Sequence, residues 1–175
     1  MFSRIIITSL LFLSTGMVSH AQENDNKFIL SIGPEISWAE GTLQNTASFG
    51  YGGHVHAELV TIEKLRITAG FSGINYTGRK YKDIYGYENK YLDFEALRLT
   101  GGIKYFCYRG LFVEGKAGVF TDLGADVHTT GFTYSPVIGF EFGEDTYYDI
   151  NLHYDTYVYH GQSLGGISFT ISYQF

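Results

Sequence analysis

The stretch that decides the fold is Gly166-Ile167-Ser168-Phe169-Thr170-Ile171-Ser172-Tyr173-Gln174-Phe175. From Ile167 onward, large apolar side chains stand at every second position, and small polar side chains fill the positions between them. Successive side chains of a β-strand point to opposite faces of the sheet, so a period of two predicts a strand with one apolar face. We therefore expect an amphipathic strand that ends at Phe175.

The same alternation recurs seven times earlier in the chain. In the first instance Phe28, Ile32 and Trp38 share one parity, and Ser31 and Glu35 occupy the other. The remaining predicted strands are centred on residues 54–59, 65–72, 97–105, 113–122, 138–142 and 148–158. Eight amphipathic strands predict an all-β fold, an eight-stranded antiparallel up-and-down barrel.

The connections between these strands alternate in length. Short turns are expected at 61–64, 108–110 and 144–146, and longer polar loops at 39–48, 79–90 and 124–133, whereas the short link at 160–163 breaks the trend. Short turns on one rim and long loops on the other are typical of transmembrane barrels in outer membranes, where the long loops are extracellular.

The N-terminus has the pattern of a secretory signal peptide. Arg4 precedes an apolar run from Ile5 to Leu13, and Ser19 and Ala21 place small residues at the cleavage positions. The alternative, an N-terminal anchor helix, requires a longer apolar run to span a bilayer. We therefore expect a signal peptide over 1–21, a short periplasmic leader over 22–26 and a barrel domain over 27–175.

Composition narrows the classes of partner. Residues 1–21 contain only one charged side chain, so 11 of the 12 basic residues and all 18 acidic residues remain after cleavage. This acidic balance excludes a nucleic-acid binder, which needs basic residues to neutralise phosphates. The mean hydropathy of −0.03 is compatible with a membrane barrel, because alternation hides the apolar half in the average.

The alternate strand positions that hold polar residues, which we call the polar parity, include charges of both signs and several histidines. We predict that these residues fill the barrel lumen: Glu35, His54, His56, Glu58, Arg66, Arg98, Lys104, Glu114, Lys116, Asp122, Glu141, Asp149, His153 and Asp155. An eight-stranded barrel leaves an interior that side chains fill, so we expect a packed ionic core and not a conduction path.

The apolar parity has tyrosine and tryptophan near strand ends, at Trp38, Tyr105, Tyr148 and Tyr173. Aromatic girdles of this kind flank the lipid-facing belt of membrane barrels. A soluble lipocalin-like barrel, with its apolar side chains turned inward, is the alternative fold.

The last strand resembles the C-terminal signal of outer-membrane barrels, which ends in Phe and is recognised by the barrel-assembly machinery. The residues that carry this resemblance are Gly166, Phe169, Ile171, Tyr173 and Phe175. In length, strand number and loop asymmetry, residues 27–175 resemble OmpA/OmpX-type and porin-family barrel domains. The resemblance implies a location in the bacterial outer membrane, with its lipid and the assembly machinery as partners.

Two groups of side chains contain residue types that bind transition metals. His54, His56 and Glu58 share a face, as do His153 and Asp155. Neighbours on one face of a strand are roughly 6–7 Å apart, which is awkward for holding one ion. We expect hydrogen-bonded polar residues here, with no metal and no cofactor.

Enzymatic activity has weak support in the sequence. Small barrels that modify lipid A use a His-x-Ser pair or an Asp-Ser pair, and neither motif occurs. We expect no catalytic residue, although a lipid A-modifying enzyme stays open as an alternative, as does a soluble ligand-binding barrel.

The segment 79–91 holds Tyr81, Tyr85 and Tyr87 among charged residues. Tyrosine beside charge suits an adhesive surface. The preferred hypothesis is a non-enzymatic outer-membrane barrel with a filled lumen, structural or binding an extracellular ligand or protein through its loops.

Overall fold

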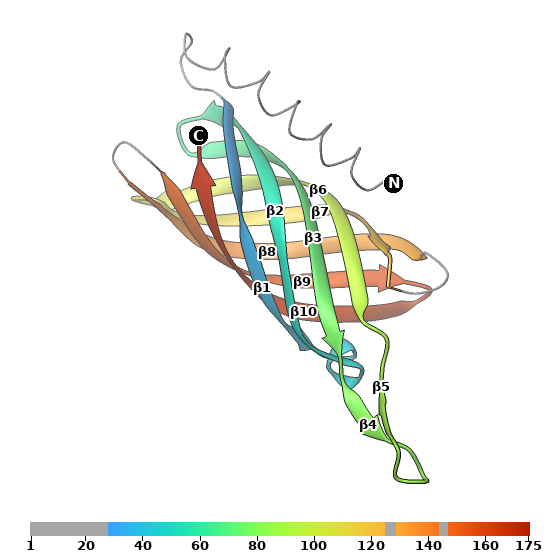
Figure 1. Cartoon of the computed structure of the whole chain (residues 1–175). Helices are drawn as coiled ribbons and strands as arrows, with labels where there is room; N and C mark the ends of the chain where they lie inside the picture. Colours follow the sequence, from blue (N-terminus) through green and yellow to red (C-terminus); the bar gives the residue numbers. More distant parts are fainter. Residues whose placement is uncertain (1–27, 125–128, 144–146) are drawn as a thin grey trace, which may run out of the picture.

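A computed structural model describes residues 28–124, 129–143 and 147–175, which form a closed β-barrel (Figure 1). Its eight strands are β1 (Phe28–Glu40), β2 (Ala47–Ile62), β3 (Leu65–Gly78), β6 (Phe94–Tyr108), β7 (Leu111–Asp122), β8 (Thr129–Phe142), β9 (Tyr148–Tyr159) and β10 (Gln162–Gln174). Each pairs with its neighbours along the chain in antiparallel fashion, and β1 pairs with β10. The predicted fold class is confirmed.

Three predictions fall outside the described residues. The signal peptide at 1–21, the leader at 22–26 and the turn at 144–146 stay predictions. Within the part of the chain that the structure describes, no helix is long and apolar enough to cross a membrane.

The first and last strands close the ring. Ile32 lies opposite Tyr173 and Trp38 opposite Ile167. At the end of the seam, Leu30 and Phe175 exchange backbone hydrogen bonds, at 3.3 Å from the Leu30 N–H and 2.9 Å from the Phe175 N–H. Closure leaves no sheet edge with unpaired backbone groups, which is the condition for a β-structure in a bilayer.

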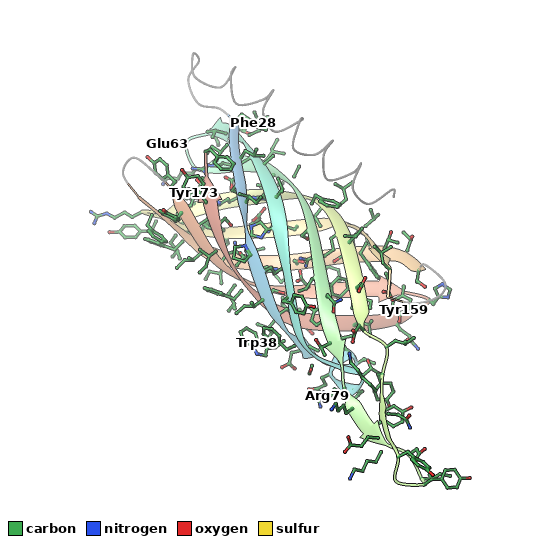
Figure 2. All side chains as sticks on the ribbon, viewed as in Figure 1. Phe28, Trp38, Glu63, Arg79, Tyr159 and Tyr173 are labelled. Atoms are coloured by element: carbon green, nitrogen blue, oxygen red, sulfur yellow. The ribbon has the colours of Figure 1, made fainter. Side chains whose placement is uncertain are left out.

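Alternation sorts the side chains to the two faces of the wall (Figure 2). Outward residues keep large exposed fractions, 60% for Leu99 and 47% for Trp38, whereas inward Glu35 and Lys104 keep 2% and 0%. The apolar parity therefore faces out and the charged parity faces in, as the pattern predicted.

Two of the short turns have left-handed backbone at both central residues. The φ angles are 35° and 85° at Arg109 and Gly110, and 47° and 75° at His160 and Gly161. Such turns match the twist of the flanking strands, and each glycine adopts its positive φ without steric cost.

The predicted loops at 39–48 and 124–133 were too long. β1 continues to Glu40, β2 begins at Ala47 and β8 begins at Thr129, where it pairs with Asp122. Polar residues continue the ladder at this rim because backbone pairing does not require an apolar face. Within the first loop, the 3-10 helix η1 (Leu43–Asn45) buries Leu43.

The loop between β3 and β6 contains a small hairpin, made of β4 (Lys80–Lys82) and β5 (Glu88–Lys90). We refer to residues 79–93 as the hairpin segment. It projects beyond the rim at the end opposite to the C-terminus (Figure 1).

Candidate functional site: a filled lumen and a projecting hairpin

An aromatic layer closes the lumen at its long-loop end. Tyr76, Phe94, Phe120 and Tyr157 point inward and are at most 9% exposed, and Leu43 of η1 packs onto them. The ring centroids of Phe94 and Phe120 lie 5.4 and 5.1 Å from that of Tyr157, both edge to face, the arrangement that aromatic quadrupoles favour. We call this group the loop-side aromatic layer.

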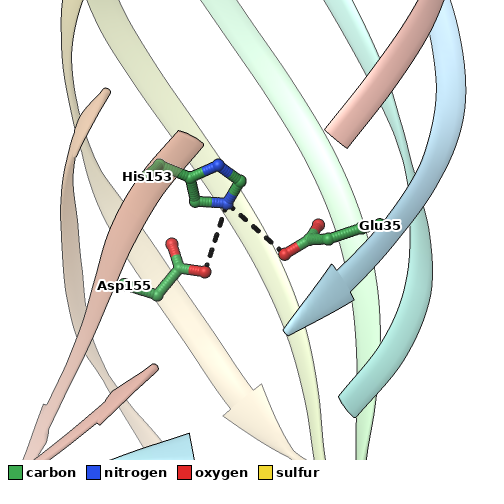
Figure 3. Close-up of side chains that lie close together, drawn as sticks. All are labelled: Glu35, His153 and Asp155. Carbon is green, nitrogen blue, oxygen red and sulfur yellow. Dashed lines mark ion pairs between the residues drawn. The ribbon is translucent and has the colours of Figure 1, made fainter. Parts of the chain in front are cut away.

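The Arg98 cluster lies next to it. Nη2 of Arg98 donates to both carboxylate oxygens of Glu35, at 2.7 and 2.6 Å, and Nη1 pairs with Asp155. Nε2 of His153 lies 3.4 Å from Glu35 and 3.3 Å from Asp155 (Figure 3). Ser168 donates to Asp155 at 2.9 Å. Four strands therefore contribute to one buried ionic group.

A second ionic group, the Lys104 cluster, lies towards the short-turn end. Nζ of Lys104 contacts Glu58 at 2.8 Å, Asp149 at 3.0 Å and the carboxylate of Glu141. Arg66 Nη1 adds contacts of 2.7 Å to Glu58 and 2.9 Å to Glu141. Each cation is shared by two or three acids, so the group has no unpaired basic side chain.

Two phenylalanine rings pack against the cations of the Lys104 cluster. The ring centroid of Phe112 lies 3.9 Å from Lys104 Nζ, and that of Phe106 lies 4.4 Å from the guanidinium carbon of Arg66. A cation over an aromatic face is attracted by the ring quadrupole. Phe112 is fully buried, so this end of the lumen is also occupied.

A polar chamber remains between the two clusters. Its volume is about 40 Å³, room for on the order of three water molecules. His54, His56, Thr170 and Lys116 contribute to its wall. Within the described residues, His54 Nδ1 and Thr170 Oγ1 are buried without a protein hydrogen-bond partner, and His56 Nε2 has only the ionic contact of 3.4 Å with the Glu114 carboxylate. Buried polar atoms of this kind are usually satisfied by ordered water.

One wall of the chamber carries a serine–histidine pair. His54 Nε2 and Ser172 Oγ are 2.8 Å apart, although β1 lies between their strands. The inward residue of β1 opposite His54 is Gly33, where a Cβ would collide with the backbone of Ile171. The glycine therefore allows the backbones of β1 and β10 to approach closely at the point where the imidazole reaches across β1.

The structure brings most of the predicted lumen residues into these contacts. Glu114 accepts a hydrogen bond from Thr68 at 2.6 Å and lies 3.6 Å from Lys116 Nζ. Asp122 is different. Its carboxylate accepts from the backbone N–H groups of Glu95 and Gly124, at 3.3 and 2.9 Å, and shapes the rim instead of joining the ionic core.

Sequence reasoning missed the aromatic layers. Phe94, Phe112 and Phe120 share the inward parity of charged neighbours, for example Phe112 with Glu114. That parity was the available signal. The predicted lumen contains only the polar and charged residues of the inward rows and omits these large aromatic ones.

Among the described residues, two clusters of side chains have ligand atoms close enough together for a metal ion: Glu35, His153 and Asp155, and Glu58, Glu141 and Asp149. Arg98 bridges the two acids of the first, and Lys104 contacts all three acids of the second. A metal ion would bring two positive charges against a cation that already neutralises each group. The donor sets therefore fit basic side chains better than metals.

The tip of the hairpin segment is a turn held by hydrogen bonds. Oδ1 of Asp83 accepts from the N–H groups of Tyr85 and Tyr87, both at 2.9 Å, and Gly86 donates to the Asp83 carbonyl at 3.0 Å. The turn presents Ile84, Tyr85 and Tyr87 at 92, 79 and 70% exposure. These three residues form what we call the apolar tip.

The base of the hairpin segment is tied to the barrel rim. Gly78 N–H donates to Asp93 at 2.8 Å, and Lys90 Nζ lies 2.7 Å from the same carboxylate. The Gly78 hydrogen bond, with the Lys90 contact, holds the pKa of Asp93 below its usual range. The rings of Tyr81 and Tyr91 pack at 4.5 Å, which stiffens the stem.

A closed barrel whose exterior is apolar and whose interior is filled by ion-paired side chains belongs to a defined class, the transmembrane β-barrels of the outer-membrane type. Solved structures of that class share the fold. The chain is similar to Ail of Yersinia pestis in complex with the heparin analogue sucrose octasulfate (TM-score 0.56, 13% identity, 85% of this chain and 97% of that chain). It is likewise similar to neisserial surface protein A (0.57, 11%, 85% and 96%) and to OprG of Pseudomonas aeruginosa (0.52, 11%, 85% and 95%).

At this identity the likeness concerns the fold alone. No protein-family model matches the sequence, and no curated protein matches it.

Proposed function

We propose that this protein is a non-enzymatic, non-conducting barrel of the bacterial outer membrane that binds an extracellular partner through the hairpin segment. The observation that carries the proposal is the apolar tip, which is held in a fixed turn beyond the rim of a filled barrel.

The apolar tip suits insertion into an apolar pocket of a partner protein. Ile84 is 92% exposed although it has no polar atom to offer to water or to a sugar. Tyrosine is enriched among the residues that contribute most to binding energy. Because Asp83 already fixes the turn, little conformational entropy remains to be lost on binding.

The filled lumen supports the absence of conduction. A permeating ion would meet the loop-side aromatic layer, the Arg98 cluster, the Lys104 cluster and Phe112 in succession. Both clusters are buried ion pairs, and separating one partner of such a pair is strongly unfavourable.

The chemistry of the chamber supports a non-enzymatic role. His54 and Ser172 resemble a base and a nucleophile, but His54 Nδ1 contacts no group that would orient the ring. The chamber of about 40 Å³ is also far smaller than a lipid substrate. The pair is best explained as a packing contact of the wall.

Site-specific photo-crosslinking in intact cells tests the binding role. A photoreactive residue replacing Tyr85 should yield a discrete adduct with an extracellular protein, whereas one replacing Tyr108, exposed on the opposite rim, should not. The adduct should be lost when Asp83→Ala breaks the turn and retained in the control Lys64→Ala. An adduct that survives the loss of Asp83, or none at position 85, would refute binding by the tip.

A further inference from the structure

If the histidines are neutral, the lumen contains more negative than positive side chains. Among the described residues, six carboxylates belong to the two clusters and the chamber wall, Glu35, Glu58, Glu114, Glu141, Asp149 and Asp155, and the four basic side chains that contact them are Arg66, Arg98, Lys104 and Lys116. Two negative charges are left over. Uncompensated charge inside a protein is costly, so two further positive charges are expected within hydrogen-bonding range of these acids.

Hydrogen bonding around His153 identifies one of them. Asn151 Nδ2 donates to Asp149 at 2.8 Å, which orients the amide so that its oxygen faces His153 Nδ1 at 3.0 Å. An amide oxygen only accepts, so Nδ1 carries a hydrogen. The other ring nitrogen, Nε2, faces Glu35 and Asp155 at 3.4 and 3.3 Å. Carboxylates also only accept, so Nε2 needs a hydrogen as well.

His56 is held in the same way by two acids. Its Nδ1 lies 3.5 Å from Glu58 and its Nε2 lies 3.4 Å from Glu114. A neutral imidazole would turn one lone pair towards a carboxylate oxygen, which is repulsive. With a proton on each nitrogen, the ring attracts both acids.

We propose that His56 and His153 are two proton-binding sites, that both rings are imidazolium in the folded barrel, and that their two protons make the lumen electrically neutral. Glu35 from β1 and Asp155 from β9 lie within 3.4 Å of the His153 ring. The other charged or titratable residues that line the same chamber are His54 and His56 from β2, Arg98 from β6, Glu114 and Lys116 from β7, and Asp149 from β9. Arg98 repels an imidazolium but is itself neutralised by the same two acids.

The surroundings of His56 are comparable. Glu58 and His54 lie on its own strand, and Glu114 and Lys116 face it from β7. Lys116 is 3.6 Å from Glu114, so it shares that acid with the ring.

Each protonated ring forms ion pairs that connect strands which are not adjacent in the sheet. His153 joins β9 to Glu35 of β1, and His56 joins β2 to Glu114 of β7. His54 is the internal contrast, because its Nε2 meets a serine hydroxyl that can donate and its Nδ1 meets no carboxylate. The geometry places no requirement for a second proton there.

Nitrogen-15 NMR of the whole barrel in lipid nanodiscs at pH 7 reads the protonation state of each ring directly. His56 and His153 should show two protonated nitrogens, and His54 should show one. A neutral tautomer at either His56 or His153 in the wild-type protein would overturn the proposal for that site.

Two matched variants separate the sites. Glu35→Gln removes one acid beside His153 and should cost that ring its second proton at pH 7 while His56 keeps both. Glu114→Gln should do the reverse. If both rings responded equally to either variant, the pairing would be wrong. Heat-modifiable gel migration verifies that each variant is folded, and the wild-type spectrum decides the question even if a variant is not.

Discussion

Nη2 of Arg98 reaches across the lumen from β6 and donates to both carboxylate oxygens of Glu35 on β1, at 2.7 and 2.6 Å. Two strands, β2 and β3, separate these residues along the wall. The contact therefore spans the interior and does not follow the sheet, and it ties the two sides of the barrel together.

Arg98→Leu should destabilise the barrel strongly. The change leaves Glu35 and Asp155 buried with His153 as their remaining cation, and breaking a buried pair costs about 3–5 kcal/mol. Urea unfolding in detergent micelles measures the loss. The control Arg109→Leu, in an exposed turn, should change stability by no more than about 0.5 kcal/mol. Equal effects of the two changes would show that the Arg98 cluster contributes little.

An arginine on the outer face should be costly only where lipid covers it. Leu99 lies within β6 with 60% of its surface exposed, and Ile84 is 92% exposed at the hairpin tip. We expect Leu99→Arg to destabilise the barrel in lipid by about 2–4 kcal/mol, the range for a bilayer midplane. Ile84→Arg should be nearly neutral because its site is in water. Similar costs at both positions, measured by urea unfolding in vesicles, would argue against a lipid-facing belt.

Planar-bilayer recordings should show no channel openings for the wild-type protein. The variant that combines Tyr157→Ala, Arg98→Ala, Lys104→Ala and Phe112→Ala removes one side chain from each of the four barriers in the lumen and leaves the inward acids in excess. This variant should conduct and should prefer cations. Its folding is checked by heat-modifiable migration. Stable openings of the wild-type protein would contradict the filled lumen.

The base of the hairpin segment should loosen in acid. Hydrogen bonding lowers the pKa of Asp93 in the folded state, so the stabilisation is present above the unfolded pKa and lost as pH falls through the lower folded value. The unfolded value is about 3.9, so the loss begins below roughly pH 4. Amide exchange of Gly78, the donor to Asp93, should accelerate relative to other rim amides in that range, and Asp93→Asn should abolish the change.

The sequence predicted the wall of the barrel well, because each wall position depends on parity alone. Leu99 faces out and Arg98 faces in because side chains alternate along the strand. This alternation can be recognised from the sequence of a single strand. Strand ends at the rim were less predictable. Thr129 pairs with Asp122 through backbone groups that polar residues supply as well as apolar ones.

Contacts across the lumen could not be predicted, because they depend on the stagger between strands that are distant in sequence. Parity places His153, Glu35 and Arg98 inside, but only the register of β1, β6 and β9 brings them together. The same holds for His54 and Ser172, which meet across β1 at a position where that strand has a glycine, Gly33.

Trp38 allows the most direct test, because it is the only tryptophan in the chain and lies on the outer face of β1. Its fluorescence can be measured for the wild-type barrel in vesicles containing brominated phospholipid. If the apolar parity faces lipid, brominated chains should quench Trp38 strongly and aqueous iodide should quench it weakly. Strong quenching by iodide with no effect of brominated lipid would contradict the account, because the apolar face would then not lie against the membrane.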